Sequence, residues 1–173
     1  MGYAVKEIFK TLQGEGAHAG RPAVFCRFSG CNLACTFCDT DYAGIDGTDG
    51  GRYEMAGDLV ATIERSWQAP PAHRFVVLTG GEPLLQADAM LVDLLHARGF
   101  EVAVETNGTL DAPPGIDWVC VSPKSRDGLR LRTGNELKPV YPQAEVPPEA
   151  FAGLAFERFS LQPMDGSALS ENT

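Results

Sequence analysis

The sequence Phe75-Val76-Val77-Leu78-Thr79-Gly80-Gly81-Glu82-Pro83 joins a continuous apolar run to a glycine-rich turn. An apolar run of this length without polar alternation is typical of a β-strand buried on both faces, as in a parallel sheet. The two glycines and the proline that follow are residues that end a strand and begin a turn. The stretch therefore predicts a central parallel strand that is followed by an irregular segment.

Helical and strand patterns alternate around this strand. Helices are predicted over residues 55–67 and 87–98, the second with Met90, Leu91, Leu94 and Leu95 facing inward. Gly99 then stands where a helix commonly ends, and a short helix is predicted over residues 148–154, which begin with proline. Further strands are predicted over residues 3–9, 23–28, 102–105, 118–122, 136–140 and 156–162.

Strands that alternate with helices form parallel βαβ units, so the sequence predicts an α/β fold with mostly parallel strands. Such sheets bind their ligands at the carboxyl ends of the strands. The unusual residues of this sequence follow the predicted strands: Thr79-Gly80-Gly81-Glu82-Pro83, Glu105-Thr106-Asn107-Gly108, Ser122-Pro123-Lys124 and Gln162-Pro163-Met164-Asp165. We therefore expect one active-site face.

Size and charge exclude several classes of protein. With 173 residues the chain is expected to form one domain, residues 1–173. The net charge of −9 and the lack of a basic patch argue against a nucleic-acid partner. No apolar run approaches the roughly 20 residues that cross a membrane, and no secretory signal is visible. We expect a cytoplasmic protein.

Three of the five cysteines lie close together, in Cys31-Asn32-Leu33-Ala34-Cys35-Thr36-Phe37-Cys38. This C-x3-C-x2-C spacing, without an export signal, indicates a metal or redox site rather than disulfides. Thiolates suit zinc or iron–sulfur clusters. A cubane cluster ordinarily takes four cysteines, so three would leave one iron open to an outside ligand.

A structural zinc site is the alternative, but it requires four closed ligands. Cys26 and Cys120 could in principle supply the fourth, although each lies in a predicted apolar strand and resembles a small buried hydrophobic residue. The three histidines have no ligand spacing. The residues therefore favour an iron–sulfur cluster on Cys31, Cys35 and Cys38 over a zinc-binding interaction module.

The cysteine spacing resembles that of the radical S-adenosylmethionine (SAM) superfamily, and the Thr79–Pro83 segment resembles its second signature. Paired glycines let the backbone approach a ligand closely, and a nearby glutamate can accept hydrogen bonds from an ammonium group. Within the superfamily, the chain resembles the 7-carboxy-7-deazaguanine synthases over nearly its whole length. The resemblance rests on Phe9-Lys10-Thr11-Leu12-Gln13-Gly14-Glu15-Gly16, Arg27-Phe28-Ser29-Gly30-Cys31-Asn32-Leu33, Cys38-Asp39-Thr40-Asp41 and the strand-end segments already quoted.

The resemblance implies a partial βα barrel and a ring-contracting lyase. The family converts 6-carboxy-5,6,7,8-tetrahydropterin to 7-carboxy-7-deazaguanine with loss of ammonia, on the route to queuosine and other deazapurines. The implied cofactors are a 4Fe-4S cluster, SAM and Mg²⁺. The implied partners are the pterin, an electron donor such as a flavodoxin and a second copy of the chain in a homodimer. Because the cofactor starts the radical chemistry, no protein side chain is expected to act as the catalyst.

The resemblance also implies residue roles. Arg27 offers a planar charged fork for the substrate carboxylate, while Gln13 and Glu15 can bind the pterin edge. Thr40 matches the magnesium ligand, a hard oxygen donor. The full pterin set is Leu12, Gln13, Gly14, Glu15, Arg27 and Thr79. The full SAM set is Phe37, Cys38, Asp39, Gly81, Ser122, Pro123, Lys124, Gln162, Pro163, Met164 and Asp165.

The chain departs from the family at its end, because family members continue for a few tens of residues beyond the position of Thr173. We therefore expect the C-terminal part of the family domain to be missing and pterin binding to be weakened. A radical enzyme that activates a glycyl-radical partner is the other alternative. The Thr11–Gly16 segment and Arg27 argue against it, because they suit a small anionic heterocycle.

Overall fold

The computed structural model describes residues 2–70, 72–143 and 146–164. Its main sheet has eight strands in the order β3-β1-β2-β4-β5-β6-β7-β9. They are β1 (Tyr3–Leu12), β2 (Pro22–Phe28), β3 (Gly51–Tyr53), β4 (Phe75–Gly80), β5 (Glu101–Thr106), β6 (Trp118–Val121), β7 (Thr133–Leu137) and β9 (Ala155–Phe159). A small parallel pair is formed by β8 (Val140–Tyr141) and β10 (Gln162–Pro163).

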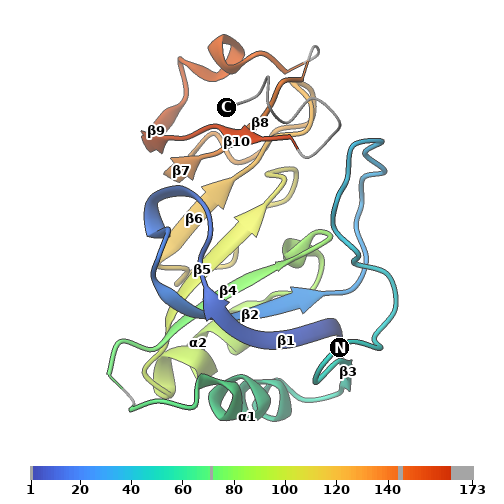
Figure 1. Cartoon of the computed structure of the whole chain (residues 1–173), viewed down its shortest axis with the longest axis vertical. Coiled ribbons are helices and arrows are strands. Elements are labelled where there is room, and N and C mark those ends of the chain that lie inside the picture. The colour runs from blue at the N-terminus through green and yellow to red at the C-terminus, as the bar shows by residue number, and fades with distance from the viewer. Residues whose placement is uncertain (1, 71, 144–145, 165–173) are drawn as a thin grey trace.

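The sheet is parallel from β2 to β9, while β1 runs antiparallel to both β2 and β3. The helices α1 (Ala56–Trp67) and α2 (Ala89–Ala97) lie together (Figure 1), with α1 against β1 and β2 and α2 against β5. Short 3₁₀ helices occupy Gly16–His18, Pro83–Leu85 and Pro148–Phe151. The structure thus has the predicted α/β arrangement of mostly parallel strands.

The core lies between the two helices and one face of the sheet. Side chains that alternate along the strands, such as Cys26, Leu78 and Val104, are fully buried against the helices. Their neighbours point to the opposite face, because successive strand residues alternate sides. That second face has a small apolar cluster, Ala23, Phe75, Val77 and Ala103, and it becomes polar toward the strand ends.

Four predictions of detail differ from the structure. Met90 is 64% exposed rather than inward, because α2 begins after its N-cap Asp88 and buries Leu91, Val92 and Leu95. The predicted strand over residues 136–140 is divided into β7 and β8, since Pro139 has no N–H for the ladder. The predicted strand over residues 156–162 is likewise divided into β9 and β10. In the place of the predicted helix over residues 148–154 there is only the 3₁₀ turn Pro148–Phe151.

Candidate active site

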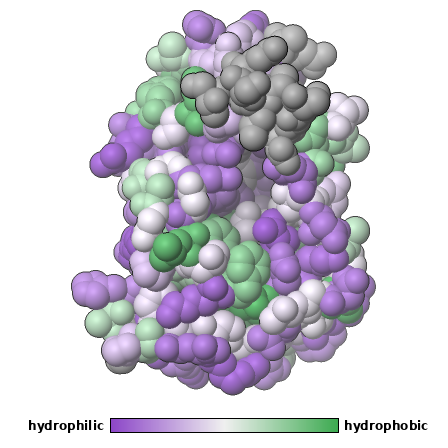
Figure 2. Space-filling view, viewed as in Figure 1, coloured by the Kyte–Doolittle hydropathy of each residue, from purple (hydrophilic) through white to green (hydrophobic). Residues whose placement is uncertain are grey.

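A cavity of about 490 Å³ opens at the carboxyl ends of the parallel strands, within the range typical of small-molecule sites. The side of the molecule seen in Figure 2 is hollowed near its middle, and hydrophilic residues border the hollow. The predicted site residues that line the cavity are Gln13, Glu15, Arg27, Cys31, Cys35, Phe37, Cys38, Asp39, Thr40, Thr79, Gly81, Ser122, Lys124, Gln162, Pro163 and Met164. The strand-end segments of the sequence therefore meet at one site.

Three predicted residues do not line this cavity. Leu12 is 58% exposed, and it alternates with Gln13, which is buried. Gly14 and Pro123 are likewise neighbours of cavity-lining residues without lining the cavity themselves. Asp165 lies outside the described residues. The predicted ligand contacts of these four residues stay predictions.

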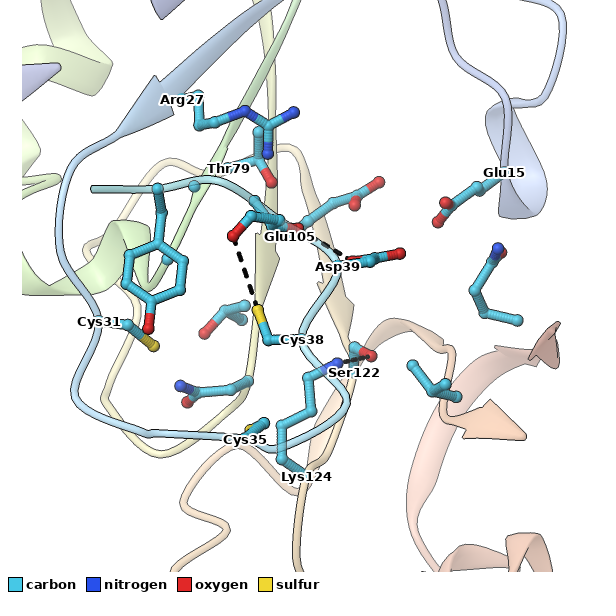
Figure 3. Close-up of a pocket in the computed structure, with 18 of the residues that line it drawn as sticks. Glu15, Arg27, Cys31, Cys35, Cys38, Asp39, Thr79, Glu105, Ser122 and Lys124 are labelled. Atoms are coloured by element: carbon cyan, nitrogen blue, oxygen red, sulfur yellow. Dashed lines mark hydrogen bonds between the residues drawn. The ribbon is translucent and has the colours of Figure 1, made fainter. Parts of the chain in front are cut away.

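Strand pairing places a row of polar side chains across the cavity wall. Arg27 of β2 pairs with Glu7 of β1 on one side and with Thr79 of β4 on the other. Glu105 of β5 follows Val104, the partner of Leu78, and so continues the same row. These four residues all line the cavity, and Figure 3 shows Arg27, Thr79 and Glu105 along one wall. The row would offer both charge signs to a ligand.

The cysteine loop borders the other side of the cavity (Figure 3). Cys31, Cys35 and Cys38 are all free, the first two half-buried and the third exposed, whereas Cys26 and Cys120 are buried in strands, as predicted. The N–H of Leu33 donates to the Cys31 sulfur at 3.4 Å, and the N–H of Cys38 donates to the Cys35 carbonyl oxygen at 3.3 Å. These local bonds fold the loop so that all three thiols reach one cavity.

The donor set of this loop fits a cluster better than a single ion. Among the described residues, no three His, Cys, Asp or Glu side chains converge to hold one metal ion. A cubane cluster distributes its thiolates over separate irons, so its ligands surround a volume rather than a point. Three free thiols around a cavity satisfy that requirement, and no fourth cysteine of the described residues lines the cavity.

The loop that follows Cys38 is tied to β1 by one lysine. Lys6 is 9% exposed, and its Nζ lies 2.9 Å from Asp41 Oδ2, 2.8 Å from Asp46 Oδ1 and 2.9 Å from the Ala43 carbonyl oxygen. Thr40 lies just before these anchors and lines the cavity, its hydroxyl 3.2 Å from Asp39 Oδ1. The anchor therefore fixes the position of the predicted magnesium ligand.

The start of the cysteine loop is tied to the end of β5. Asn32 accepts a hydrogen bond from Asn107 Nδ2 at 2.9 Å and donates to the Thr109 hydroxyl at 2.8 Å. The Asn107 backbone N–H in turn donates to Glu82 at 2.8 Å. The loop that carries Cys31 is thereby connected to β4 and β5 through polar side chains.

The motif suggests that Glu82 accepts hydrogen bonds from an ammonium group of a ligand, but in the structure its side chain binds other groups of the protein. Its side chain is fully buried and accepts from the N–H of Leu84 at 2.9 Å, the hydroxyl of Thr106 at 2.7 Å and the N–H of Asn107. Burial raises the pKa of this carboxyl, although the three donors oppose the shift. The carboxylate braces the ends of β4 and β5 and is not exposed to an ammonium group in the cavity.

The paired glycines of the same motif permit close backbone packing. Gly80 has a φ of +139°, and a Cβ there would lie 2.3 Å from the Phe28 carbonyl oxygen. A Cβ on Gly81 would lie 2.2 Å from the Gly30 carbonyl oxygen and 2.8 Å from the Cys31 Cβ. The glycines therefore let the end of β4 lie directly against the start of the cysteine loop.

We expect Gly80→Ala to lower the free energy of unfolding by about 3 kcal/mol or more, because it combines backbone strain with a backbone clash. Urea unfolding measures the change. Gly57→Ala is the matched control, since Gly57 lies in α1 and a Cβ there meets nothing within 4 Å; it should be neutral or stabilise by up to about 1 kcal/mol. Equal midpoints for the two variants would contradict the close packing.

A buried lysine lies between two acids at the far end of the polar row. Lys138 is 4% exposed, and its Nζ lies 2.7 Å from Glu15 Oε2 and 3.3 Å from Glu105 Oε1. Gln13 also donates to Glu105, at 2.7 Å. Burial acts to lower the pKa of Lys138, but the neighbouring acids outweigh it and raise the pKa above its ordinary value. The lysine thus stays charged and holds both carboxylates at the cavity.

Lys124 is a second, half-buried cation of the cavity. Its Nζ lies 2.9 Å from the Ser122 hydroxyl and 6.0 Å from the centre of the Phe37 ring, a distance at which a cation–π contact is weak. Burial lowers the pKa of Lys124. The contact joins the end of β6 to the cysteine loop, so two predicted SAM segments meet.

Sequence reasoning missed several residues that line the cavity, among them Glu7, Tyr42, Glu105 and Lys138. Glu105 belongs to the segment Glu105-Thr106-Asn107-Gly108, which the sequence singled out as the end of a predicted strand. That position at a strand end could have identified Glu105 as a site residue. Lys138 and Glu7 gave no signal, because their role depends on partners from distant strands.

The fold and the cysteine-lined cavity define a radical SAM protein. A family profile described as the Radical SAM superfamily matches residues 26–126, and the chain belongs to that superfamily. The 7-carboxy-7-deazaguanine synthases of Bradyrhizobium diazoefficiens and Bordetella pertussis are 64% and 59% identical to it, with 100% of this chain and 88% of each relative covered. Within the superfamily, the chain belongs to the 7-carboxy-7-deazaguanine synthase family of deazapurine biosynthesis.

A solved structure agrees with this assignment. The crystal structure of QueE from Escherichia coli superimposes with a TM-score of 0.77 at 32% sequence identity, covering 99% of this chain and 87% of that chain. The predicted fold class, superfamily and family are thereby confirmed, and the radical SAM family implies a 4Fe-4S cluster and SAM. Neither helix of the described residues is long and apolar enough to cross a membrane.

Proposed function

We propose that the cavity binds 6-carboxy-5,6,7,8-tetrahydropterin beside a 4Fe-4S cluster and SAM, and that the enzyme contracts the pterin to 7-carboxy-7-deazaguanine with loss of ammonia. The observation that carries the proposal is that one cavity is lined by the three loop cysteines, by Arg27 and by the ends of four parallel strands. When bound, the cluster and SAM supply the electron and the adenosyl radical that start the reaction.

The residues of the chain would divide the cavity into two regions. Cys31, Cys35 and Cys38 would hold the cluster, and Lys124 with Ser122 would border SAM on the same side. At the other side, the polar row that ends in Glu105 and the nearby Glu15 would hold the pterin. Carboxylates accept hydrogen bonds from the N–H groups of an aminopyrimidine ring. The guanidinium of Arg27 suits the carboxylate of the pterin.

Anaerobic reconstitution with iron and sulfide tests the proposal. We expect about four irons per chain, and we expect release of 5′-deoxyadenosine from SAM under reduction to rise when the carboxylated tetrahydropterin is added. A protein that takes up zinc but no iron would contradict the proposal. So would a protein whose release of 5′-deoxyadenosine is unchanged when the pterin is added.

We further propose that Thr40 is a ligand of a Mg²⁺ ion that assists the reaction. Its hydroxyl is a hard oxygen donor at the cavity edge, next to the carboxylate of Asp39. We expect Thr40→Val to raise the Mg²⁺ concentration for half-maximal turnover by at least about tenfold. Thr36→Val is the control, since Thr36 lies in the same loop but does not line the cavity. An unchanged magnesium dependence in Thr40→Val would remove Thr40 from the metal site.

The remaining expectations are also proposals for this chain. A homodimer is tested by sedimentation velocity, and reduction by a flavodoxin is tested by replacing dithionite with that protein in the assay. The single-domain organisation and the cytoplasmic location stay predictions. The chain spans 88% of the length of each of the two relatives quoted above.

A further inference from the structure

Strand β1 contains a bulge at the cavity wall. Val5 pairs with Phe28 and Glu7 pairs with Arg27, so two steps along β1 match one step along β2. Lys6 is the extra residue, and the burial of Val5 and Lys6 in succession breaks the alternation of the strand. Bulges bend a strand and redirect the side chains that follow them, and they are frequent beside active sites.

The bulge has two consequences for the site. It directs Lys6 toward the loop that follows the cysteines, where it meets Asp41 and Asp46. It also directs Glu7 toward the cavity face of the sheet, opposite Arg27. The loop packs closely on the bulge, since a Cβ on Gly47 would lie 2.7 Å from both the Glu7 Cβ and the Lys6 carbonyl oxygen.

Glu7 binds one particular nitrogen of Arg27. Its Oε1 accepts from Arg27 Nε at 2.8 Å, and the two side chains are only 30% and 21% exposed. Among the described residues, no other side chain forms an ion pair with this guanidinium. The two terminal nitrogens of Arg27 therefore remain for a ligand, and the guanidinium lies beside Thr79 on the cavity wall (Figure 3).

An arginine needs such a partner to act as a selective fork. Its side chain has about 2 kcal/mol of rotamer entropy, and an unheld guanidinium would sample several orientations in a cavity of this size. A carboxylate that holds Nε fixes the plane of the guanidinium and directs the terminal nitrogens outward. Bidentate binding of a second carboxylate requires that geometry.

We propose that Glu7 is a positioning residue that makes the cavity selective for a heterocycle bearing a carboxylate, by fixing Arg27 through Nε. This inference rests on the proposed function, because the ligand class is that of the pterin carboxylate. The acceptor atom of Glu7 matters more than its charge, since the charge would by itself oppose an anionic ligand. Glutamine at position 7 should therefore substitute for glutamate, whereas alanine should not.

Binding without turnover tests the inference. The reconstituted protein is titrated calorimetrically, with SAM but without reductant, against oxidised 6-carboxypterin and against pterin, which has the same ring and no carboxylate. We expect Glu7→Ala to weaken 6-carboxypterin by about tenfold, corresponding to loss of part of a charge-assisted hydrogen-bond pair, and to leave pterin unchanged. Glu7→Gln should stay within about threefold of the wild type for both ligands, since it keeps the acceptor.

Two further variants keep the test decisive. Glu7→Thr suits a strand and is too short to reach Arg27, so it replaces Glu7→Ala if that variant does not fold. Arg27→Ala should abolish the preference for the carboxylated ligand. If Arg27→Ala loses the preference while Glu7→Ala and Glu7→Thr keep it, or if Glu7→Ala weakens both ligands equally, the positioning role is wrong. If the wild type binds neither ligand, the proposed pterin function itself is wrong.

Discussion

Glu82→Leu should lower the free energy of unfolding by about 4 kcal/mol, because it leaves three buried donors without an acceptor at about 1–3 kcal/mol each, partly offset by the removal of a buried charge. The donors are the N–H groups of Leu84 and Asn107 and the hydroxyl of Thr106. Urea unfolding and amide exchange at Asn107 measure the effect. The loss should appear in the protein without cluster as well, since the brace consists of protein groups alone.

Glu82→Gln is the matched control for this experiment. The amide has the same shape and keeps one acceptor oxygen, so we expect a smaller loss of stability than in Glu82→Leu. If Glu82→Leu instead retained full stability and lost only the affinity for SAM, the carboxylate would be a ligand-binding group. The interpretation as a brace between β4 and β5 would then be wrong.

Replacing Cys31, Cys35 or Cys38 by alanine should abolish turnover while leaving the fold intact. Each thiol lies on an irregular loop at the cavity rather than in the core, so its loss should change the free energy of unfolding by less than about 1 kcal/mol. Because a cluster needs each ligand, iron and sulfide content should fall sharply in all three variants. Iron analysis, visible absorption and turnover are the measurements.

Cys120→Ala is the control, and we expect it to affect stability rather than iron content. Cys120 is 3% exposed within β6, and burial raises the pKa of its thiol well above the ordinary range. The variant should keep its iron and lose about 1 kcal/mol of stability, as an average core truncation does. Full turnover in any of the three loop variants would place the cluster ligands elsewhere.

The sequence predicted the elements of the parallel sheet because their signals are local. The apolar run at residues 75–78 and the capping residue Gly99 each depend on a few neighbours along the chain, and the structure has both β4 and the end of α2 there. Met90 was wrongly predicted to face inward, because that prediction also used only neighbours along the chain. A helical face that is largely apolar does not indicate which of its residues meets the sheet.

The site was predictable where it follows strand ends and unpredictable where it depends on pairing between strands. The cysteine loop, Arg27 and Thr79 stand out in the sequence, and the structure brings them to one cavity. The ion pairs of Lys138 and the bulge at Lys6 do not stand out, because each depends on residues far away in the chain. Strict alternation along β1 would have placed Glu7 on the face of Val5, and only the bulge reverses it.

The same distinction applies to the Gly-Gly-Glu-Pro motif. The sequence indicated a close approach of the backbone to a ligand, whereas the structure shows a close approach to the backbone of Phe28 and Gly30. It also shows that Glu82 is enclosed by its three donors. A motif thus specifies that the backbone must pack closely, while the neighbouring strand determines what it packs against.

Mass analysis of the pterin after anaerobic incubation is the most direct test of the account. The reconstituted enzyme is supplied with 6-carboxy-5,6,7,8-tetrahydropterin, SAM, Mg²⁺ and dithionite. We predict that 7-carboxy-7-deazaguanine accumulates and that it is absent when SAM or the reductant is omitted. Recovery of unchanged pterin from a protein that holds its cluster and cleaves SAM would contradict the account.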